Sequence, residues 1–357
     1  MVEDFTPQMV LDGVWEGSSE RTSSRELRRL CLQVVAQYGI LPTSLTLGRV
    51  KHEAESLNAT GYADLFRGVY QTSTVALKRF RSYGSMTHAD RQKAYKNFLR
   101  DTVTWGSLRH DYVLPFLGVA DDVSPGTLCI VTPWMENGNL RRYLENETTR
   151  GNLTDANFAE KANNWLYQTA EGIAYLHEEG VVHGDLHPGN ILVDDAGHIK
   201  LTDIGMSITS EVTAYINEFT SGAGALRWTA PELFEPERFG LEESFETCQS
   251  DIYAFGCTVF EIYTGNVPFD GKLNSQIPGL VIKGERPHRP PPSQLRTIGD
   301  DVWKLITLCW AQKRSRRPSA GQVVKTLSKI CHGSQHSHSN KSFFILPSLI
   351  RRFVSRN

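Results

Sequence analysis

The chain has 357 residues, of which 38 are Lys or Arg, 40 are Asp or Glu and 40 % are hydrophobic. Its length suits two domains or one two-lobed domain, and its charged fraction of 22 % excludes a disordered or fibrous chain. The net charge of −2 gives no electrostatic reason to expect a nucleic acid partner, and no apolar run approaches the roughly 18 residues that a membrane-spanning helix needs.

The cysteines and the first residues indicate the compartment. The six Cys are scattered and form no CxxC pair, a usage typical of a reducing environment. The first residues, MVEDFTPQMV, are acidic and lack the basic and apolar regions of a signal peptide. We therefore expect a cytoplasmic, intracellular protein without a transmembrane segment.

Residues 1–48 form an N-terminal extension. Residues 1–22 are polar and mixed, and we expect them to be mobile. Ser23 and Glu26 then form a capping box, and apolar residues recur at helical spacing on one face: Leu27, Leu30, Cys31, Val34, Val35 and Tyr38. One amphipathic helix is predicted, which braces the following domain; a helix that binds a partner is the alternative.

From 49 to 135 the sequence predicts a small, mainly antiparallel β unit. Two strands, at 62–70 and 73–80, are separated by the short polar link Gln71-Thr72, which is typical of a hairpin. One helix is predicted at 90–105. Two further apolar runs follow, at 113–119 and 127–132.

From 136 to 331 the pattern changes to helices with short strands between them. Helices are predicted at 140–145, 157–179, 248–263, 300–311 and 319–330, and strands at 190–193 and 199–202. The last helix has its own capping signal, Ser319 with Gln322. Residues 332–357 are rich in Ser, His and Asn before an apolar, basic end, and they are expected to form a flexible tail; a weak surface anchor is the alternative.

The most informative segment is 181–193, VVHGDLHPGNILV, which is predicted to join a long helix to a short strand. Asp203 follows Asp185 by eighteen residues, and a predicted hairpin lies between them. That hairpin is expected to bring Asp203 back towards Asp185 and Asn190. Three oxygen donors without His or Cys ligands favour Mg²⁺, which completes its shell with phosphate and water.

This segment resembles the protein kinase family, whose catalytic loop reads His-Arg-Asp-x-x-x-x-Asn and whose metal motif reads Asp-Phe-Gly. The resemblance implies that Asp185 is the catalytic base, which accepts the proton of the substrate hydroxyl. It also implies that Asn190 and Asp203 hold Mg²⁺ beside ATP. The string HGDLHPGN is equally similar to the aminoglycoside and choline phosphotransferases, which act on small molecules.

The C-terminal half favours the protein kinases. Ala230-Pro231-Glu232 resembles the segment that closes a protein kinase activation loop. Asp251 matches the helix that underpins the catalytic loop, and Arg317 matches the late Arg that pairs with the Glu of Ala-Pro-Glu. Taken singly, Asp251 is an ordinary helix-start residue and Arg317 a surface residue. Together, in order and at family spacing, the motifs indicate a protein kinase domain over residues 49–331.

In the N-terminal unit, Val75-Ala76-Leu77-Lys78 resembles the kinase strand whose Lys contacts the α- and β-phosphates of ATP. A Lys at a sheet edge is the alternative. Asp101 stands where the family has the Glu that pairs with this Lys. It shares an inward stripe with Phe98 and Trp105.

The segment after residue 127 is similar to the strand that leads into the kinase hinge. The resemblance implies that Pro133 and Met135 bind adenine through backbone atoms, since Pro133 offers a carbonyl and Met135 keeps its N–H. Thr132 would then be the side chain that gates the back of the ATP pocket.

The chain departs from the family pattern at several positions. In the Gly-rich loop only Gly61 lies between the usual glycine positions, which predicts weaker but not abolished ATP binding. Gly184 replaces an Arg that reads a phosphate on the activation loop, and Ala225 replaces a Thr that bonds the catalytic Asp. His187 replaces a Lys that steadies the transferring phosphate, and it is kept in the catalytic set because the small-molecule phosphotransferases work with His there.

The sequence as a whole therefore predicts an α+β, protein-kinase-like bilobal fold. A small antiparallel β N-lobe with one helix is expected at 49–135 and a larger, mainly α C-lobe at 136–331. The nearest pattern is the tyrosine-kinase-like group of Ser/Thr kinases. The predicted function is transfer of the γ-phosphate of MgATP to Ser or Thr hydroxyls, or to Tyr, of protein substrates, with four catalytic residues: Asp185, Lys78, Asn190 and His187. A pseudokinase that acts as a binding or scaffold module is the alternative.

Overall fold

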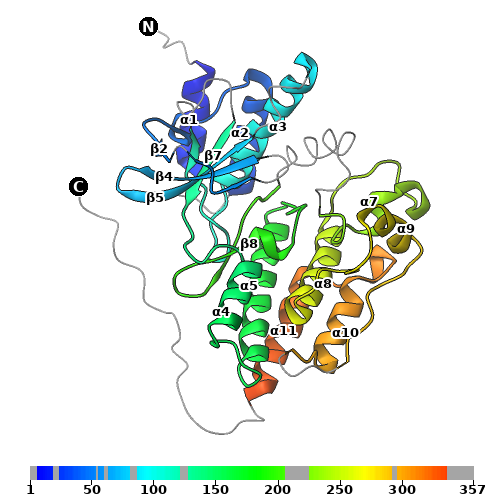
Figure 1. Ribbon diagram of the computed structural model, residues 1–357. Helices are drawn as coiled ribbons and strands as arrows, with labels where there is room; N and C mark the ends of the chain where they lie inside the picture. The colour runs from blue at the N-terminus through cyan, green and yellow to red at the C-terminus, as the bar shows by residue number, and fades with distance from the viewer. Residues whose placement is uncertain are drawn as a thin grey trace.

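The computed structural model describes residues 6–18, 24–53, 55–59, 63–80, 87–120, 128–205, 225–291 and 296–335. These residues form two lobes: a twisted sheet with helices beside it, and a larger lobe built mostly of helices (Figure 1). This confirms the predicted bilobal α+β fold. Within the described part of the chain, no helix is both long enough and apolar enough to cross a membrane.

The N-terminal lobe is built on one sheet, whose strands are β1 (Thr46–Leu47), β2 (Lys51–His52), β3 (Asn58–Ala59), β4 (Ala63–Tyr70), β5 (Ser73–Phe80), β6 (Gly118–Ala120) and β7 (Cys129–Pro133). The order is β1-β6-β7-β5-β4-β2, with β3 also on β4. The predicted hairpin is confirmed as β4–β5, with Gln71 at a φ of 54° in its turn. The sequence did not predict the parallel pair β1–β6.

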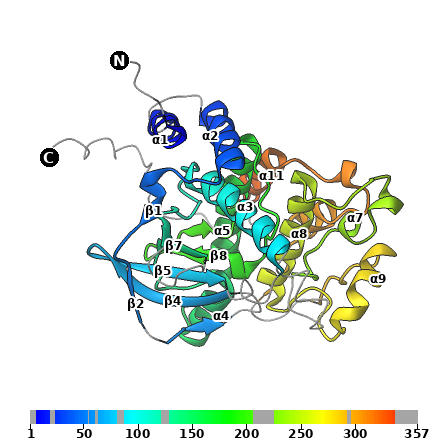
Figure 2. The same ribbon diagram turned by 90° about the horizontal axis from the view of Figure 1, so that it is seen from above.

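The helix α3 (His88–Gly106) packs on one face of this sheet (Figure 2). Thr87 begins it, because its side chain accepts a hydrogen bond from the Asp90 N–H. The predicted inward stripe is confirmed: Phe98, Asp101 and Trp105 are all buried. The helix therefore presents a carboxylate on the face that packs against the sheet.

The N-terminal extension corrects two expectations. Residues 7–18 were expected to be mobile, but they form the helix α1 (Pro7–Ser18), so the described residues of the extension hold two α-helices where one was predicted. The physical reason is packing: Leu11 is fully buried, and the Asp12 carboxylate accepts hydrogen bonds from the Thr43 N–H and hydroxyl at 2.7 and 2.8 Å. A short helix of this kind gains most of its stability from tertiary contacts, which local periodicity does not reveal.

The predicted helix of the extension is α2 (Ser24–Tyr38), and its buried face agrees with the predicted one in part. Cys31 and Val35 are buried as predicted, whereas Leu30 and Tyr38 are about half exposed and Arg28, outside the predicted stripe, is buried. Ser23, one of the two residues of the predicted capping box, lies outside the described residues. The helix packs against α1 on one side and α3 on the other (Figure 2).

Arg28 connects the two lobes. Its Nη1 lies 3.4 Å from Ser107 Oγ, just after α3, and 3.2 Å from Glu179 Oε2, at the end of a C-lobe helix. Its Nη2 donates to the Glu179 carbonyl. Because Arg28 is buried, its charge depends on these contacts. The extension therefore packs against both lobes and links them. This agrees with the interpretation that its helix stabilises the following domain.

We expect Arg28→Ala to lower the free energy of unfolding by about 2 kcal/mol, because the variant removes charge-assisted hydrogen bonds from a buried position. Urea unfolding of the full chain measures this change. Arg29→Ala is the matched control, since Arg29 is exposed on the same helix. An equal loss of unfolding free energy in the two variants would contradict a stabilising role of Arg28 between the lobes.

The C-terminal lobe consists mainly of the helices α4 (Leu140–Thr149), α5 (Phe158–Glu178), α7 (Pro231–Phe234), α8 (Cys248–Thr264), α9 (Ile277–Ile282), α10 (Asp300–Cys309) and α11 (Ala320–Gln335). The predicted cap of α11 is confirmed: the Ser319 N–H donates to Gln322 Oε1 at 2.8 Å, and the Gln322 N–H donates to Ser319 Oγ. The helix continues past residue 331, where the flexible tail was expected to begin. Residues 336–357 of that tail lie outside the described part.

The core of the C-terminal lobe is the pair α5 and α8, of which α8 is buried almost along its whole length. The predicted short hairpin is confirmed as β8 (Ile191–Val193) and β9 (Ile199–Leu201), which are antiparallel. Leu201 also bonds back to the segment before β6, through Leu114 N–H to Leu201 O at 2.8 Å. The hairpin is thereby fixed at the junction of the two lobes.

Candidate active site

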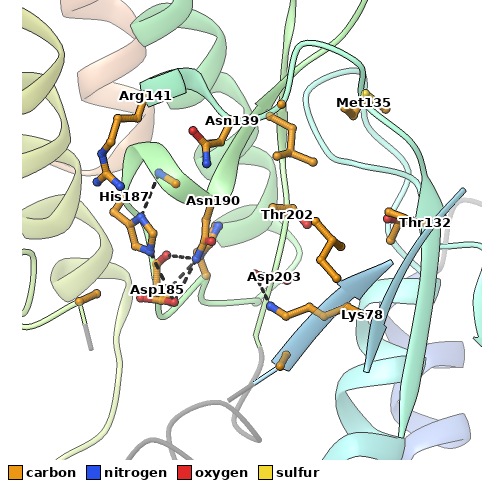
Figure 3. A pocket seen from close by; sticks show the side chains of 18 of the residues that line it. Lys78, Thr132, Met135, Asn139, Arg141, Asp185, His187, Asn190, Thr202 and Asp203 are labelled. Carbon is orange, nitrogen blue, oxygen red and sulfur yellow. Dashed lines mark hydrogen bonds and ion pairs between the residues drawn. The ribbon is translucent and has the colours of Figure 1, made fainter. Parts of the chain in front are cut away.

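A cleft of about 1690 Å³ lies where the two lobes meet, and it is lined by β5, β7, the segment after β7 and the loops on either side of the β8–β9 hairpin. Figure 3 shows that the residues predicted to carry the chemistry converge here from these separate elements. Asp185, Asn190 and Asp203 lie in the middle, and Lys78 approaches them from β5 (Figure 3).

Lys78 joins the two lobes through an ion pair. On β5, Lys78 pairs with Ile130 of the neighbouring strand β7. Its Nζ lies 2.6 Å from Asp203 Oδ2. Both side chains are largely buried. Asp203 has a φ of 60°, in the left-handed region, which costs a non-glycine residue about 1 kcal/mol. The strained backbone and the ion pair together direct the carboxylate into the cleft.

Asp185 and Asn190 form a second pair on the opposite wall. Asn190 Nδ2 donates to the Asp185 carbonyl at 2.9 Å and to Asp185 Oδ2 at 3.0 Å. The short turn Pro188–Asn190 sets this geometry, and the Asn190 carbonyl accepts the Thr202 N–H, next to Asp203. The hairpin therefore returns the chain to Asn190, as its spacing predicted.

The donor set at this point fits Mg²⁺. Since the Asn190 amide nitrogen donates to Asp185, its Oδ1 is left as a neutral oxygen ligand. Asp203 adds a carboxylate, and neither His nor Cys is needed. Mg²⁺ takes few protein oxygens and fills the rest of its shell with phosphate and water, so these two residues suffice for a nucleotide-bound ion.

Asp251, near the start of α8, supports the loop that precedes β8 and contains Asp185. The Asp251 carboxylate accepts the His183 N–H at 2.8 Å and the Gly184 N–H at 2.9 Å, and His177 Nε2 lies 2.8 Å away. Gly184 has a φ of 82°, which few other residues adopt. The predicted support from this helix is confirmed. The sequence reasoning missed His177, because only the fold brings α5 beside the start of α8.

The predicted pair of Glu232 and Arg317 is also confirmed. Arg317 Nη1 and Nη2 donate to the two Glu232 carboxylate oxygens at 2.6 and 2.7 Å, and both side chains are almost completely buried. The pair fixes the Ala-Pro-Glu segment to the base of the lobe. The alternative of a surface Arg is therefore wrong.

His187 lies beside Asp185, with its Nε2 3.8 Å from Asp185 Oδ2. Its Nδ1 accepts the Gly189 N–H at 3.0 Å, so in the neutral ring Nε2 carries the proton and faces the carboxylate. Burial lowers the pKa of His187, and the nearby Asp185 only partly opposes this. At neutral pH the side chain is therefore a neutral donor, and it does not replace the positive charge of a Lys.

The burial of His187 predicts a pH dependence of stability. Its pKa in the folded chain is below the ordinary value of 6.5, so below that pH the unfolded chain binds more protons. The contribution of the neutral His187 ring to the free energy of unfolding is therefore complete above pH 6.5. It is lost as the pH falls towards the lowered pKa. Urea unfolding at pH 8 and pH 5.5 should show a smaller pH effect in His187→Gln than in the wild type. His288→Gln, at an exposed position, is the control and should leave the pH effect unchanged.

Thr132 and Met135 line the right-hand wall of the cleft in Figure 3, and Pro133 follows Thr132 at the end of β7. Asp101 is buried on α3, and Arg100 Nε lies 3.7 Å from its carboxylate. Its predicted pairing with Lys78 stays a prediction, as does adenine binding at Pro133 and Met135. Gly61 lies outside the described residues.

The sequence reasoning did not single out Arg141, which also lines the cleft. Its Nε lies 2.6 Å from Glu261 Oε1 on α8, and its guanidinium lies over the Trp228 ring at 5.7 Å. In sequence it is an ordinary Arg on an amphipathic helix, and its partners are about ninety and 120 residues away. No local signal could have revealed it.

Comparisons with known proteins agree with this geometry. The family model of the protein tyrosine and serine/threonine kinases matches residues 52–327. The chain is 30 % identical to serine/threonine/tyrosine-protein kinase HT1 of Arabidopsis thaliana, over 75 % of this chain and 63 % of that protein. It is 32 % identical to serine/threonine-protein kinase 12 of the same plant, over 64 % of this chain and 46 % of that protein.

The receptor tyrosine-protein kinase erbB-4 of Homo sapiens is 27 % identical, over 88 % of this chain and 23 % of the receptor. The chain thus spans less than two-thirds of the length of each of these relatives. The matched residues include both lobes, the cleft between them and all of the predicted catalytic and metal-binding positions. The chain belongs to the protein tyrosine and serine/threonine kinase family.

Proposed function

We propose that this protein transfers the γ-phosphate of MgATP to Ser or Thr hydroxyls of protein substrates, with Tyr as the alternative acceptor. The observation that carries the proposal is the convergence of two pairs in one cleft, Lys78 with Asp203 and Asp185 with Asn190. Phosphoryl transfer needs mainly positioning and charge neutralisation, and these four side chains have the required charges and donors.

Each residue has a role in this proposal. Asp203 and Asn190 Oδ1 would hold Mg²⁺, which would neutralise negative charge on the phosphates of ATP. Lys78 contacts the α- and β-phosphates, and its present partner Asp203 keeps it directed into the cleft. The Asp185 carboxylate accepts the proton of the acceptor hydroxyl. His187, neutral and with its Nε2–H towards Asp185, orients that carboxylate.

The nucleotide side of the cleft completes the proposal. The Pro133 carbonyl and the Met135 N–H bind adenine, Thr132 limits the back of the pocket, and Gly61 belongs to the loop over the phosphates. Asp101 pairs with Lys78 when ATP is bound. A cytoplasmic location is proposed as well, and it is supported by the six cysteines, all of which are free thiols.

The test is radiolabelled phosphate transfer from MgATP to a generic protein substrate and to the chain itself, with Asp185→Asn beside the wild type. Transfer that disappears in the variant supports the kinase, and acid hydrolysis of the product separates phospho-Ser and phospho-Thr from phospho-Tyr. A folded wild type without transfer above the variant, at millimolar MgATP, would instead favour the pseudokinase.

A further inference from the structure

Arg141 is held in the cleft by contacts on two sides. Glu261, which is 5 % exposed, accepts a hydrogen bond from its Nε at 2.6 Å. The Trp228 ring lies under the guanidinium, with 5.7 Å between the guanidinium carbon and the ring centre. A planar guanidinium fixed at one edge and on one face has lost most of its freedom to turn. Its other edge therefore points in a defined direction.

That other edge carries donors that have no partner in the part of the chain that the structure describes. Arg141 is 39 % exposed, and Nη1 and Nη2 donate to no acceptor among the described residues. Nη1 lies close to Gly189, 3.7 Å from the position that a Cβ would take there. Two terminal nitrogens carry four N–H groups, the arrangement that binds a carboxylate or a phosphate through two parallel hydrogen bonds.

The position of these donors relative to Asp185 indicates their ligand. Figure 3 shows the guanidinium beside His187, on the side of Asp185 away from Lys78, Thr132 and Met135. The nucleotide belongs to that other side. Arg141 therefore lies in the half of the cleft where the phosphate acceptor must approach.

The electrostatic balance also favours an anion. Only one oxygen of Glu261, Oε1, accepts a hydrogen bond from Arg141, and burial raises the pKa of this carboxyl. Glu261 positions Arg141 but does not cover its open edge. An acidic group brought in by a substrate would complete the hydrogen bonding of Nη1 and Nη2.

We propose that Arg141 selects protein substrates that carry an anionic side chain close to the acceptor hydroxyl. The shared chemistry is a carboxylate or a phosphate group, that is, Asp or Glu or an already phosphorylated residue. This inference rests on the proposed kinase function. It assigns Arg141 a specificity role, with Glu261 and Trp228 as the residues that position it.

The experiment measures peptide binding separately from transfer. Peptides whose acceptor is replaced by Ala are prepared with Asp, Asn or phosphoserine at each flanking position in turn. Their dissociation constants are measured by fluorescence anisotropy with the full chain carrying Asp185→Asn. We expect Asp or phosphoserine to bind about tenfold or more tightly than Asn at one or two positions, since hydrogen bonds to charged groups have this strength. Whichever of the two anions binds more tightly identifies the source of the ligand.

In Arg141→Gln the preference should disappear, and in Arg141→Glu a Lys at the same peptide position should become the favoured residue. Arg238→Gln, at an exposed site outside the cleft, is the control and should keep the wild-type preference. Arg141→Gln leaves Glu261 unpaired in a buried position. Where that variant does not fold, the double variant Arg141→Gln with Glu261→Gln removes both charges and tests the same point.

Three results would overturn the inference: no anionic preference in the parent chain, a preference that survives Arg141→Gln, or a variant that weakens ATP binding and leaves peptide binding unchanged. The outcome can be separated from that of the proposed function. Peptide binding that depends on Arg141 without any phosphate transfer by the wild type would contradict the kinase alone. Transfer without an anionic preference would contradict the role of Arg141 alone.

Discussion

Asp203→Ala should reduce phosphate transfer about a thousandfold or more while the chain stays folded, because it removes the only carboxylate proposed to hold Mg²⁺ and the partner of Lys78. The effect should be largest on the Mg²⁺ dependence of ATP binding, which can be measured by titration with and without the ion. Initial transfer rates at saturating ATP give the size of the loss.

Two further variants make this result specific. Asp203→Asn keeps the shape of the side chain and should lose almost as much transfer, which separates charge from packing. Asp195→Ala removes an exposed carboxylate from the turn of the neighbouring hairpin and should leave transfer within about twofold of the wild type, since surface changes have small effects. A folded Asp203→Ala protein that retained wild-type transfer would exclude the proposed metal site. A protein that never transfers phosphate, with or without Asp203, would favour the pseudokinase.

Arg317→Ala should lower the free energy of unfolding by about 3–5 kcal/mol, because it leaves the carboxylate of Glu232 buried without its partner. The loss is larger than that expected for Arg28, because Arg317 also donates to two backbone carbonyls, of Ala311 at 2.9 Å and Gln249 at 3.0 Å. Urea unfolding, followed by fluorescence of the buried Trp residues, measures the change. Arg316→Ala, at the exposed neighbouring position, is the matched control.

The double variant Arg317→Met with Glu232→Gln tests the reason for that loss. If the cost comes from an unpaired buried charge, removing both charges should recover a large part of the stability lost in Arg317→Ala. If the two changes simply add, the pair does not act as a unit. Phosphate transfer by this double variant also shows whether the ion pair is needed for activity. The segment that the ion pair anchors leads directly into the wall of the cleft.

The part of the fold that the sequence predicted best is the part where short-range patterns coincide with packing. The hairpin β4–β5 and the helices α3, α5, α8 and α10 appear where periodicity and turn residues place them. The β8–β9 hairpin does too, because a polar turn separates two short apolar runs. The small elements β1, β2, β3 and α9 were missed, since two to six residues give too little periodicity to recognise.

The N-terminal extension shows the limit of that reasoning. The sequence of α1 contains two glycines and gives a weak helical signal, and Leu11 is buried because α1 packs against α2 and the core of the lobe. In α2 the periodicity was correct and Cys31 and Val35 are buried as predicted, but Leu30 and Tyr38 are about half exposed and Arg28 is buried. Arg28 lies on the buried face because it forms an ion pair with Glu179, which is far away in the sequence.

The sequence by itself determined which residues the proposed chemistry uses: a carboxylate proposed as the base, two oxygen donors proposed for a metal and a Lys proposed to bind phosphate, each recognised by residue type and spacing. It also determined the partners of the structural motifs, Glu232 with Arg317 and the catalytic loop with Asp251, because their order is that of the protein kinases. Only the tertiary structure decided what surrounds those groups. The ionisation of a His depends on burial, and the direction of a guanidinium depends on a carboxylate about 120 residues away. Such properties arise from contacts between distant segments, which is why His187 became a neutral donor and Arg141 a candidate for substrate recognition only once the chain was folded.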